Sequence, residues 1–111
     1  LTDLVFKTGS SELGPGRFSS LAELAGYLSA RPDLKVTLVG HTDAEGSLDA
    51  NVALSKRRAQ SVADRLIAEY GVSASQVSAE GAGFLAPRAS NLTPEGRTEN
   101  RRVEAMLTST R

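Results

Sequence analysis

The stretch 34–71 limits the possible folds more than any other part of the chain. Leu34 to Gly40 is short, apolar and rich in β-branched residues, which predicts a buried strand. After a polar loop, apolar side chains recur with a helical period over 48–70, and Gly71 follows where a helix commonly ends. An amphipathic helix of this length buries its apolar stripe on a sheet, so the sequence predicts helices packed on strands.

The remaining segments complete an α+β pattern. An apolar run at 3–7 predicts a first strand, and an apolar stripe over 18–28 predicts a first helix. Alternating residues predict further strands at 77–81 and 103–107, with a short helix opening at 93–95. We therefore predict a two-layer sandwich of order β-α-β-α-β-(short α)-β, with a mixed sheet and the helices on one face.

Length and charge exclude several classes of protein. The chain has 111 residues, which suits a single domain spanning 1–111. It carries 13 Lys and Arg against 13 Asp and Glu, and a net charge of zero argues against nucleic-acid binding. It has no cysteine, which removes thiol catalysis, disulfides and thiolate metal sites. Because the first residue is Leu1, we expect a processed protein or a domain cut from a longer one, with any anchor outside this chain.

Motifs for metal, cofactor and catalytic chemistry are weak. His41, Asp43 and Glu45 alternate like metal ligands, but the chain has one histidine, so an ordinary polar loop is the better interpretation and no metal is predicted. The G-x-G-x-x-A pattern at 81–86 is followed by Pro87 instead of a helix, so no cofactor is predicted. There is no G-x-S-x-G motif, and we predict that the protein is not an enzyme. We expect hydrogen bonds from the His41 ring to hold the loop.

The long helix carries a more informative set of polar residues. Asn51, Ser55 and Arg58 share one helical face, turned only slightly from the apolar one. Asp43 lies in the loop before the helix, so Asp43 and Arg58 can converge on one cleft. Arginine offers a planar fork to a carboxylate and aspartate accepts from an ammonium, so together they suit a zwitterion. From the pattern alone, a plain Asp43–Arg58 salt bridge remains the simpler interpretation.

A second basic cluster precedes the last strand. It consists of Arg97, Arg101 and Arg102, with Arg88 upstream. One interpretation is solvated charge paired with the neighbouring glutamates, and the other is a contact for anionic groups of a ligand.

The motifs, taken in order, resemble a known family. The run Val39-Gly40-His41-Thr42-Asp43-x-x-Gly46-Ser47, followed by Asn51-x-x-Leu54-Ser55-x-x-Arg58-Ala59, resembles the signature of the OmpA-like C-terminal peptidoglycan-binding domain. This is the family of OmpA, the peptidoglycan-associated lipoprotein and MotB. The resemblance continues in Gly81-Ala82-Gly83 and Asn100-Arg101-Arg102-Val103-Glu104, so it spans nearly the whole chain.

The resemblance implies a function and a site. It implies a domain that binds peptidoglycan noncovalently through the diaminopimelate of the stem peptide, anchoring the outer membrane or an envelope complex to the cell wall. The motif Asp and Arg, here Asp43 and Arg58, would clasp the ligand, with Thr42, Asn51 and Arg102 as supporting positions. It also implies a periplasmic location, a membrane tether outside this chain, and other envelope proteins as further partners.

One departure from the family keeps alternatives open. Gly9 stands where the family often has Asn, which removes one side-chain contact. A protein-interaction domain of the same fold, using the groove for a protein partner, is therefore the alternative function. A metal-dependent enzyme centred on His41 is a third hypothesis.

Overall fold

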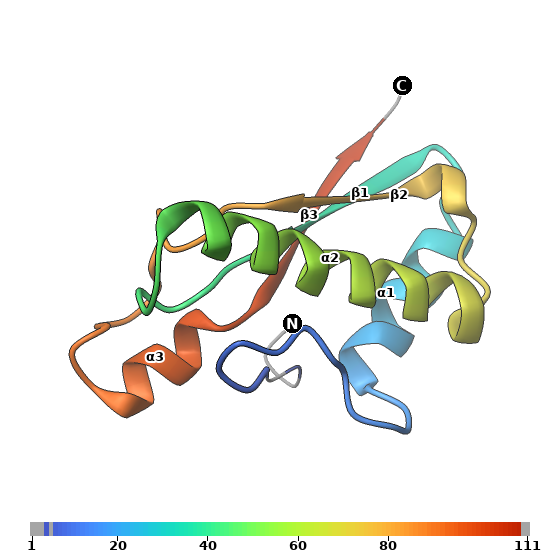
Figure 1. Ribbon diagram of the computed structural model, residues 1–111. Helices are drawn as coiled ribbons and strands as arrows, with labels where there is room; N and C mark the ends of the chain where they lie inside the picture. The colour runs from blue at the N-terminus through green and yellow to red at the C-terminus, as the bar shows by residue number, and fades with distance from the viewer. Residues whose placement is uncertain (1–3, 5, 110–111) are drawn as a thin grey trace.

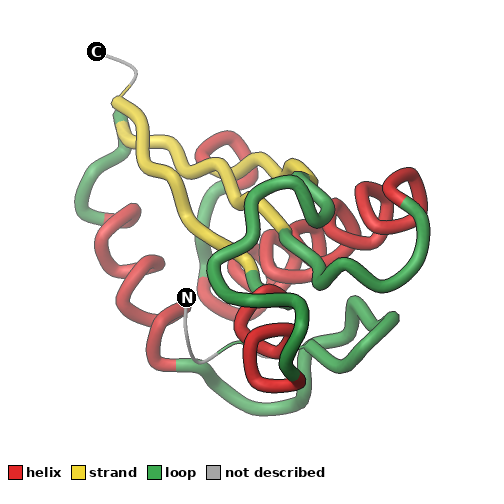
Figure 2. Tube along the Cα trace, turned by 90° about the vertical axis from the view of Figure 1, so that its left-hand side faces the viewer, coloured by secondary structure: helices red, strands yellow, loops and turns green. Residues whose placement is uncertain are grey.

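The computed structural model describes residue 4 and residues 6–109, and its elements form two layers. In chain order the elements within this part of the chain are α1 (Ser19–Ser29), β1 (Leu34–Gly40), α2 (Leu48–Tyr70), η1 (Ala74–Gln76), β2 (Val77–Gly81), α3 (Pro94–Asn100) and β3 (Val103–Ser109). Figure 1 shows α2 lying lengthwise along the sheet. Figure 2 shows the strands running side by side in a single sheet. The predicted two-layer α+β class is confirmed.

The described strands form one mixed sheet of order β2-β1-β3. β1 pairs with β2 in parallel, with Gly40 opposite Gly81. It pairs with β3 in the antiparallel sense, with Gly40 opposite Val103. The predicted second and third strands coincide with β1 and β2, and the last strand extends to Ser109. The carboxyl ends of β1 and β2 therefore meet the start of β3 at one edge of the domain.

The predicted first strand at 3–7 falls partly outside the described residues. Leu4, Phe6 and Lys7 are described, and they belong to no strand. Leu4 is 2% exposed and Phe6 is fully buried, so the apolar residues of this run contribute to the core. An apolar run indicates burial, but burial alone does not fix the ladder hydrogen bonds that define a strand.

The long helix begins and ends at the predicted signals. The side chain of Ser47 accepts a hydrogen bond from the backbone of Ala50 at 3.2 Å, which caps the first turn of α2. Gly71 follows the last turn with a φ of 72°, the left-handed conformation that glycine adopts without strain. The core lies between α1, α2 and the sheet.

Two glycines bring α2 into close contact with the sheet. A Cβ atom at Gly40 would overlap the carbonyl of Ser55, and one at Gly81 would lie 2.5 Å from Ser55 Oγ. Ser55 is fully buried, and its Oγ accepts the backbone N–H of Gly83 at 2.9 Å. This contact fixes the carboxyl ends of β1 and β2 against the helix, one turn before Arg58.

Candidate functional site

The polar residues predicted for the site gather around the loop that follows β1. Thr42 and Asp43 lie in this loop, while Asn51 and Arg58 reach its backbone from α2. Their residue exposures are 2%, 3%, 5% and 0%, respectively. Buried polar groups almost always have hydrogen-bond partners, so the partner of each group indicates what it does.

Asp43 is a buried carboxylate whose ion-pair partner is Arg101. Its Oδ2 lies 2.9 Å from Nη1 of Arg101, and the two side chains are 5% and 13% exposed. Its Oδ1 accepts the backbone N–H of Glu45 at 3.1 Å. Such charge-assisted bonds compensate the carboxylate. The free protein thus pairs Asp43 with the arginine at the corner between α3 and β3.

Arg58 is fully buried and bonded to backbone carbonyls. Its Nε donates to Ser10 at 2.8 Å, its Nη1 to His41 at 3.1 Å and its Nη2 to Lys7 at 3.0 Å. Burial lowers the pKa of Arg58 to about 10, partly opposed by the negative charge of Asp43, so the guanidinium stays protonated at neutral pH. Among the described residues no ion pair joins Arg58 to Asp43, and the simple salt bridge considered from the sequence is not formed.

Asn51 and Thr42 occupy different roles in the loop. Asn51 Nδ2 donates to the carbonyls of Glu45 at 2.7 Å and Ser47 at 3.0 Å, which fastens the loop to the first turn of α2. The backbone N–H of Thr42 donates to Gly83 at 2.8 Å. Its Oγ1 is buried and has no hydrogen-bond partner within the described part of the chain. A buried hydroxyl without a partner is rare in proteins, which sets Thr42 apart from the other polar groups of this loop.

Arg102 points to other partners than its neighbour Arg101. Its Nε lies 2.6 Å from Oε1 of Glu104, and its Nη2 donates to the carbonyl of Ala86 at 3.0 Å. Because side chains alternate along a strand, Arg102 and Glu104 project to the same face. The structure therefore brings Arg101, rather than Arg102, to Asp43.

His41 lies beside the Arg102–Glu104 pair. Its Nε2 is 3.7 Å from Oε2 of Glu104. Neither ring nitrogen has a hydrogen-bond partner among the described residues, so the expectation that the ring holds the loop by hydrogen bonds is wrong. Burial and the charge of Arg102 lower the pKa of His41, while Glu104 opposes them. The histidine contributes its backbone instead, because its carbonyl accepts from Arg58.

Two residues, Asn100 and Arg101, shape the site beyond what the sequence predicted, because Asn100 stood only in the family motif and Arg101 only in that motif and the basic cluster. Asn100 is fully buried, accepts the backbone N–H of Ala89 at 2.9 Å, and donates to Oδ1 of Asn91 at 2.9 Å. The same Asn91 oxygen accepts from the backbone of Ala44 at 3.2 Å, so these amides tie the α3 corner to the loop after β1. The sequence offered the neighbouring glutamates as partners of the basic cluster, but the signal that selects Arg101 is electrostatic, because the buried carboxylate of Asp43 needs a basic partner.

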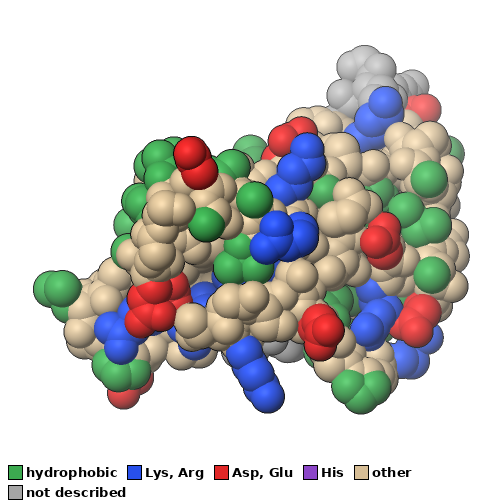
Figure 3. Space-filling model, viewed as in Figure 1, with side chains coloured by type: hydrophobic (Ala, Val, Ile, Leu, Met, Phe, Trp, Pro, Cys, Tyr) green, Lys and Arg blue, Asp and Glu red, His purple; other side chains and the backbone are tan. Residues whose placement is uncertain are grey.

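The described structure also bears on membrane and metal binding. Over residue 4 and residues 6–109, no helix is long and apolar enough to cross a membrane. In the same part of the chain, no three His, Asp or Glu side chains are placed to hold a metal ion. Figure 3 shows Lys and Arg side chains over the middle of the face seen in Figure 1, and no histidine on that face, which fits the burial of His41.

The fold and the motifs define a family. A family model described as the OmpA family matches residues 5–101, and the chain belongs to this family. The chain is 42% identical over 104 residues to the peptidoglycan-binding protein ArfA of Mycobacterium tuberculosis, covering 94% of this chain and 32% of ArfA. It is 41% identical over 103 residues to outer membrane porin F of Pseudomonas aeruginosa, covering 93% of this chain and 29% of the porin. The chain thus spans about a third of the length of these relatives.

Solved structures share the same fold over nearly the whole chain. The peptidoglycan-associated lipoprotein from Burkholderia pseudomallei superposes with a TM-score of 0.86 at 27% identity, covering 95% of this chain and 88% of that one. The C-terminal domain of Helicobacter pylori MotB superposes with a TM-score of 0.83 at 26% identity, covering 96% and 83%. The predicted resemblance to the OmpA-like family is confirmed.

Proposed function

We propose that this domain is a non-enzymatic module that binds peptidoglycan noncovalently through the diaminopimelate of a stem peptide. The observation that carries the proposal is the buried carboxylate of Asp43, paired with Arg101 at 2.9 Å, next to a second buried arginine, Arg58. A ligand that brings both an ammonium and a carboxylate can replace this one ion pair with two. No buried charge is then left uncompensated, which is the condition for opening such a pair at low cost.

Each predicted site residue has a role in this proposal. Asp43 accepts the ligand's ammonium, and Arg58 and Arg101 are the donors for its carboxylate. Thr42 offers its free hydroxyl to the ligand. Asn51 supports the site by fixing the loop to α2. Arg102 supports the site from the other side of the same corner, through its bonds to Glu104 and the loop carbonyl.

The names of the relatives support a proposal for the cellular role. ArfA is named as a peptidoglycan-binding protein, and the Burkholderia structure is of a peptidoglycan-associated lipoprotein. We extend this to a single domain over 1–111 that forms part of a longer envelope protein. It faces the periplasm, is tethered to a membrane by a segment outside this chain, and anchors that membrane or an envelope complex to the cell wall. Other envelope proteins are its further partners.

Sedimentation with purified sacculi tests the proposal. Asp43→Asn keeps the shape of the side chain and removes its charge, so we expect binding to fall roughly tenfold or more. Asp64→Asn is the matched control, because Asp64 is an exposed carboxylate whose described partner is the side chain of Gln60. Failure of the parent to sediment with sacculi rejects the proposed function.

A titration separates the diaminopimelate contact from peptidoglycan binding in general. The probes are a stem tripeptide with a free diaminopimelate amine and the same peptide with that amine acetylated. We expect the parent to bind the free amine more tightly, and Asp43→Asn to abolish this preference. Equal affinity for the two peptides would leave peptidoglycan as the ligand and remove the ammonium contact from the proposal.

A further inference from the structure

A segment without helix or strand covers Arg58. This segment, Lys7–Gly16, is called the strap here, and Figure 1 shows it in blue below α2. Three α2 side chains at helical spacing face it, namely Arg58, Ser61 and Arg65. All three donate hydrogen bonds to backbone carbonyls of the strap. These bonds therefore do not depend on the identity of the strap's side chains.

The outer two side chains act as a latch one and two turns away from Arg58. Ser61 Oγ donates to the carbonyl of Ser11 at 2.7 Å. Arg65 Nη1 donates to the carbonyls of Gly14 and Gly16, each at 3.2 Å. These bonds hold the strap without any contact to the proposed ligand groups, so they can be changed independently of the site.

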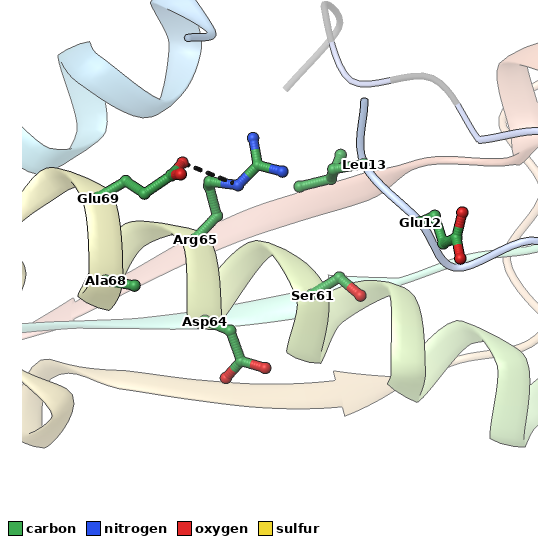
Figure 4. A pocket seen from close by; sticks show the side chains of 7 residues that line it. All are labelled: Glu12, Leu13, Ser61, Asp64, Arg65, Ala68 and Glu69. Carbon is green, nitrogen blue, oxygen red and sulfur yellow. Dashed lines mark ion pairs between the residues drawn. The ribbon is translucent and has the colours of Figure 1, made fainter. Parts of the chain in front are cut away.

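The contact between strap and helix is open rather than tightly packed. A pocket of about 410 Å³ lies between them, lined by Glu12, Leu13, Ser61, Asp64, Arg65, Ala68 and Glu69. Figure 4 shows Arg65 beside Leu13 of the strap, with its guanidinium joined to Glu69. Leu13 is the strap's partly buried apolar contact with the core. A segment held mainly by polar bonds, with a pocket beside it, can detach at a lower free-energy cost than one packed into the core.

The strap and the proposed ligand require the same donors. Two of the three carbonyls that occupy Arg58 belong to Lys7 and Ser10 of the strap. With the strap in place Arg58 is 0% exposed, so no ligand can reach it. A carboxylate is a stronger acceptor for a guanidinium than a neutral carbonyl. Gly9 and Gly16 have positive φ angles of 72° and 97°, which gives the strap two turns at which it can bend.

We propose that the strap is an internal competitor of the ligand, and that a ligand carboxylate binds Arg58 only by displacing the carbonyls of Lys7 and Ser10. This inference rests on the proposed function. Its consequence is quantitative, because the apparent affinity equals the intrinsic affinity multiplied by the fraction of molecules with the strap open. Weakening the latch raises that fraction and therefore tightens binding, although no ligand contact is added.

The test compares Arg65→Ala with Arg31→Ala, using the free-amine stem tripeptide as the probe. Arg31 is the matched control. Arg65 donates to strap carbonyls and lies over the ring of Phe18, whereas Arg31 donates to the carbonyl of Tyr27 and lies over the ring of that same residue. We expect Arg65→Ala to bind roughly three- to tenfold more tightly than the parent and Arg31→Ala to bind like the parent. Ser61→Ala removes the other latch bond and should shift affinity in the same direction.

Limited trypsin digestion gives a second readout. Cleavage after Lys7 requires its carbonyl to leave Arg58, so we expect faster cleavage in Arg65→Ala than in Arg31→Ala without ligand. In the parent, the tripeptide should accelerate this cleavage. Equal cleavage of the two variants, or ligand binding that leaves cleavage unchanged or slower, would overturn the competition. Failure of every protein to bind the tripeptide and sacculi rejects the proposed function, and the competition with it.

Discussion

Two arginines at the same end of the domain are held in opposite ways. Arg58, in the middle of α2, is fully buried and donates to three neutral carbonyls. Arg101, at the corner between α3 and β3, is partly exposed and forms an ion pair with Asp43. The first arginine is charged but forms no ion pair in the described structure, and the second completes a compensated pair. The site therefore contains one arginine without an ion-pair partner, Arg58, and one that is already paired, Arg101.

The difference teaches what each arginine can do for a ligand. Displacing a carbonyl from Arg58 by a carboxylate gives a direct ion-pair partner to a buried cation that has none in the described structure. Displacing Asp43 from Arg101 instead leaves the buried carboxylate to be satisfied by the ligand's ammonium. A zwitterion meets both requirements at once, whereas a simple anion meets only the first.

Removal of Arg58 is expected to give the largest effect. Arg58→Ala leaves three carbonyls without their donor and opens a cavity beside the core, so the free energy of unfolding should fall by about 3–5 kcal/mol. Urea unfolding measures this loss. A loss below about 1 kcal/mol would show that water replaces the guanidinium and that Arg58 is not a structural residue.

The pair at the corner is tested by a double-mutant cycle. Each of Asp43→Asn and Arg101→Ala should lower the free energy of unfolding by about 1–3 kcal/mol, with a coupling energy of similar size, because the two groups are in contact. The cycle of Asp43→Asn with Arg58→Gln should show a smaller coupling, since no ion pair joins these residues in the described structure. Coupling of equal size in the two cycles would contradict the contrast between the two arginines.

The sequence predicted where the polar residues lie in the secondary structure better than it predicted which of them form ion pairs. The periodicity that predicted α2 also placed Arg58 on an inward face, and the turn residues predicted both ends of the helix. The choice of Arg101 over Arg58 as the partner of Asp43 depends on how the α3 corner folds back, which a local pattern does not contain. The apolar run at 3–7 shows the same limit, because its residues reach the core but its described part belongs to no strand.

A third arginine, Arg102, lies beside His41 and leads to a prediction about the pH dependence of stability. The pKa of His41 is lowered from its ordinary value of 6.5 by burial and by Arg102. As the pH falls below 6.5, the unfolded chain binds a proton that the folded chain does not, so stability should fall between pH 7.5 and 5.5. The chain has one histidine, so His41→Gln should remove the slope. Glu104 does not interfere, because its lowered pKa moves its contribution to still lower pH. An unchanged slope in thermal melts of the variant would assign the titration to another group.

The smallest expected effect concerns the backbone of the strap at Gly9. Its φ is 72°, and a Cβ atom there would meet no atom within 4 Å, so conformation rather than space limits substitution. Asn tolerates the left-handed region, and Gly9→Asn should change the free energy of unfolding by less than about 1 kcal/mol. A β-branched side chain does not, so Gly9→Val should destabilise by about 1–2 kcal/mol more than Asn.

The location of this strain separates the two arginines once more. Gly9 lies between the two strap residues whose carbonyls bind Arg58, so Gly9→Val should shift the NMR signals of the strap and of the Arg58 side chain. The amide of Glu45, which reports on Asp43 through its 3.1 Å hydrogen bond, should keep its position. If Val and Asn destabilise equally, the left-handed turn is not needed to hold the strap. If the Glu45 signal moves as far as the strap signals, the surroundings of Arg58 and Arg101 respond as one cooperative unit. The two arginines would then differ in their contacts but not in their response to a change in the strap.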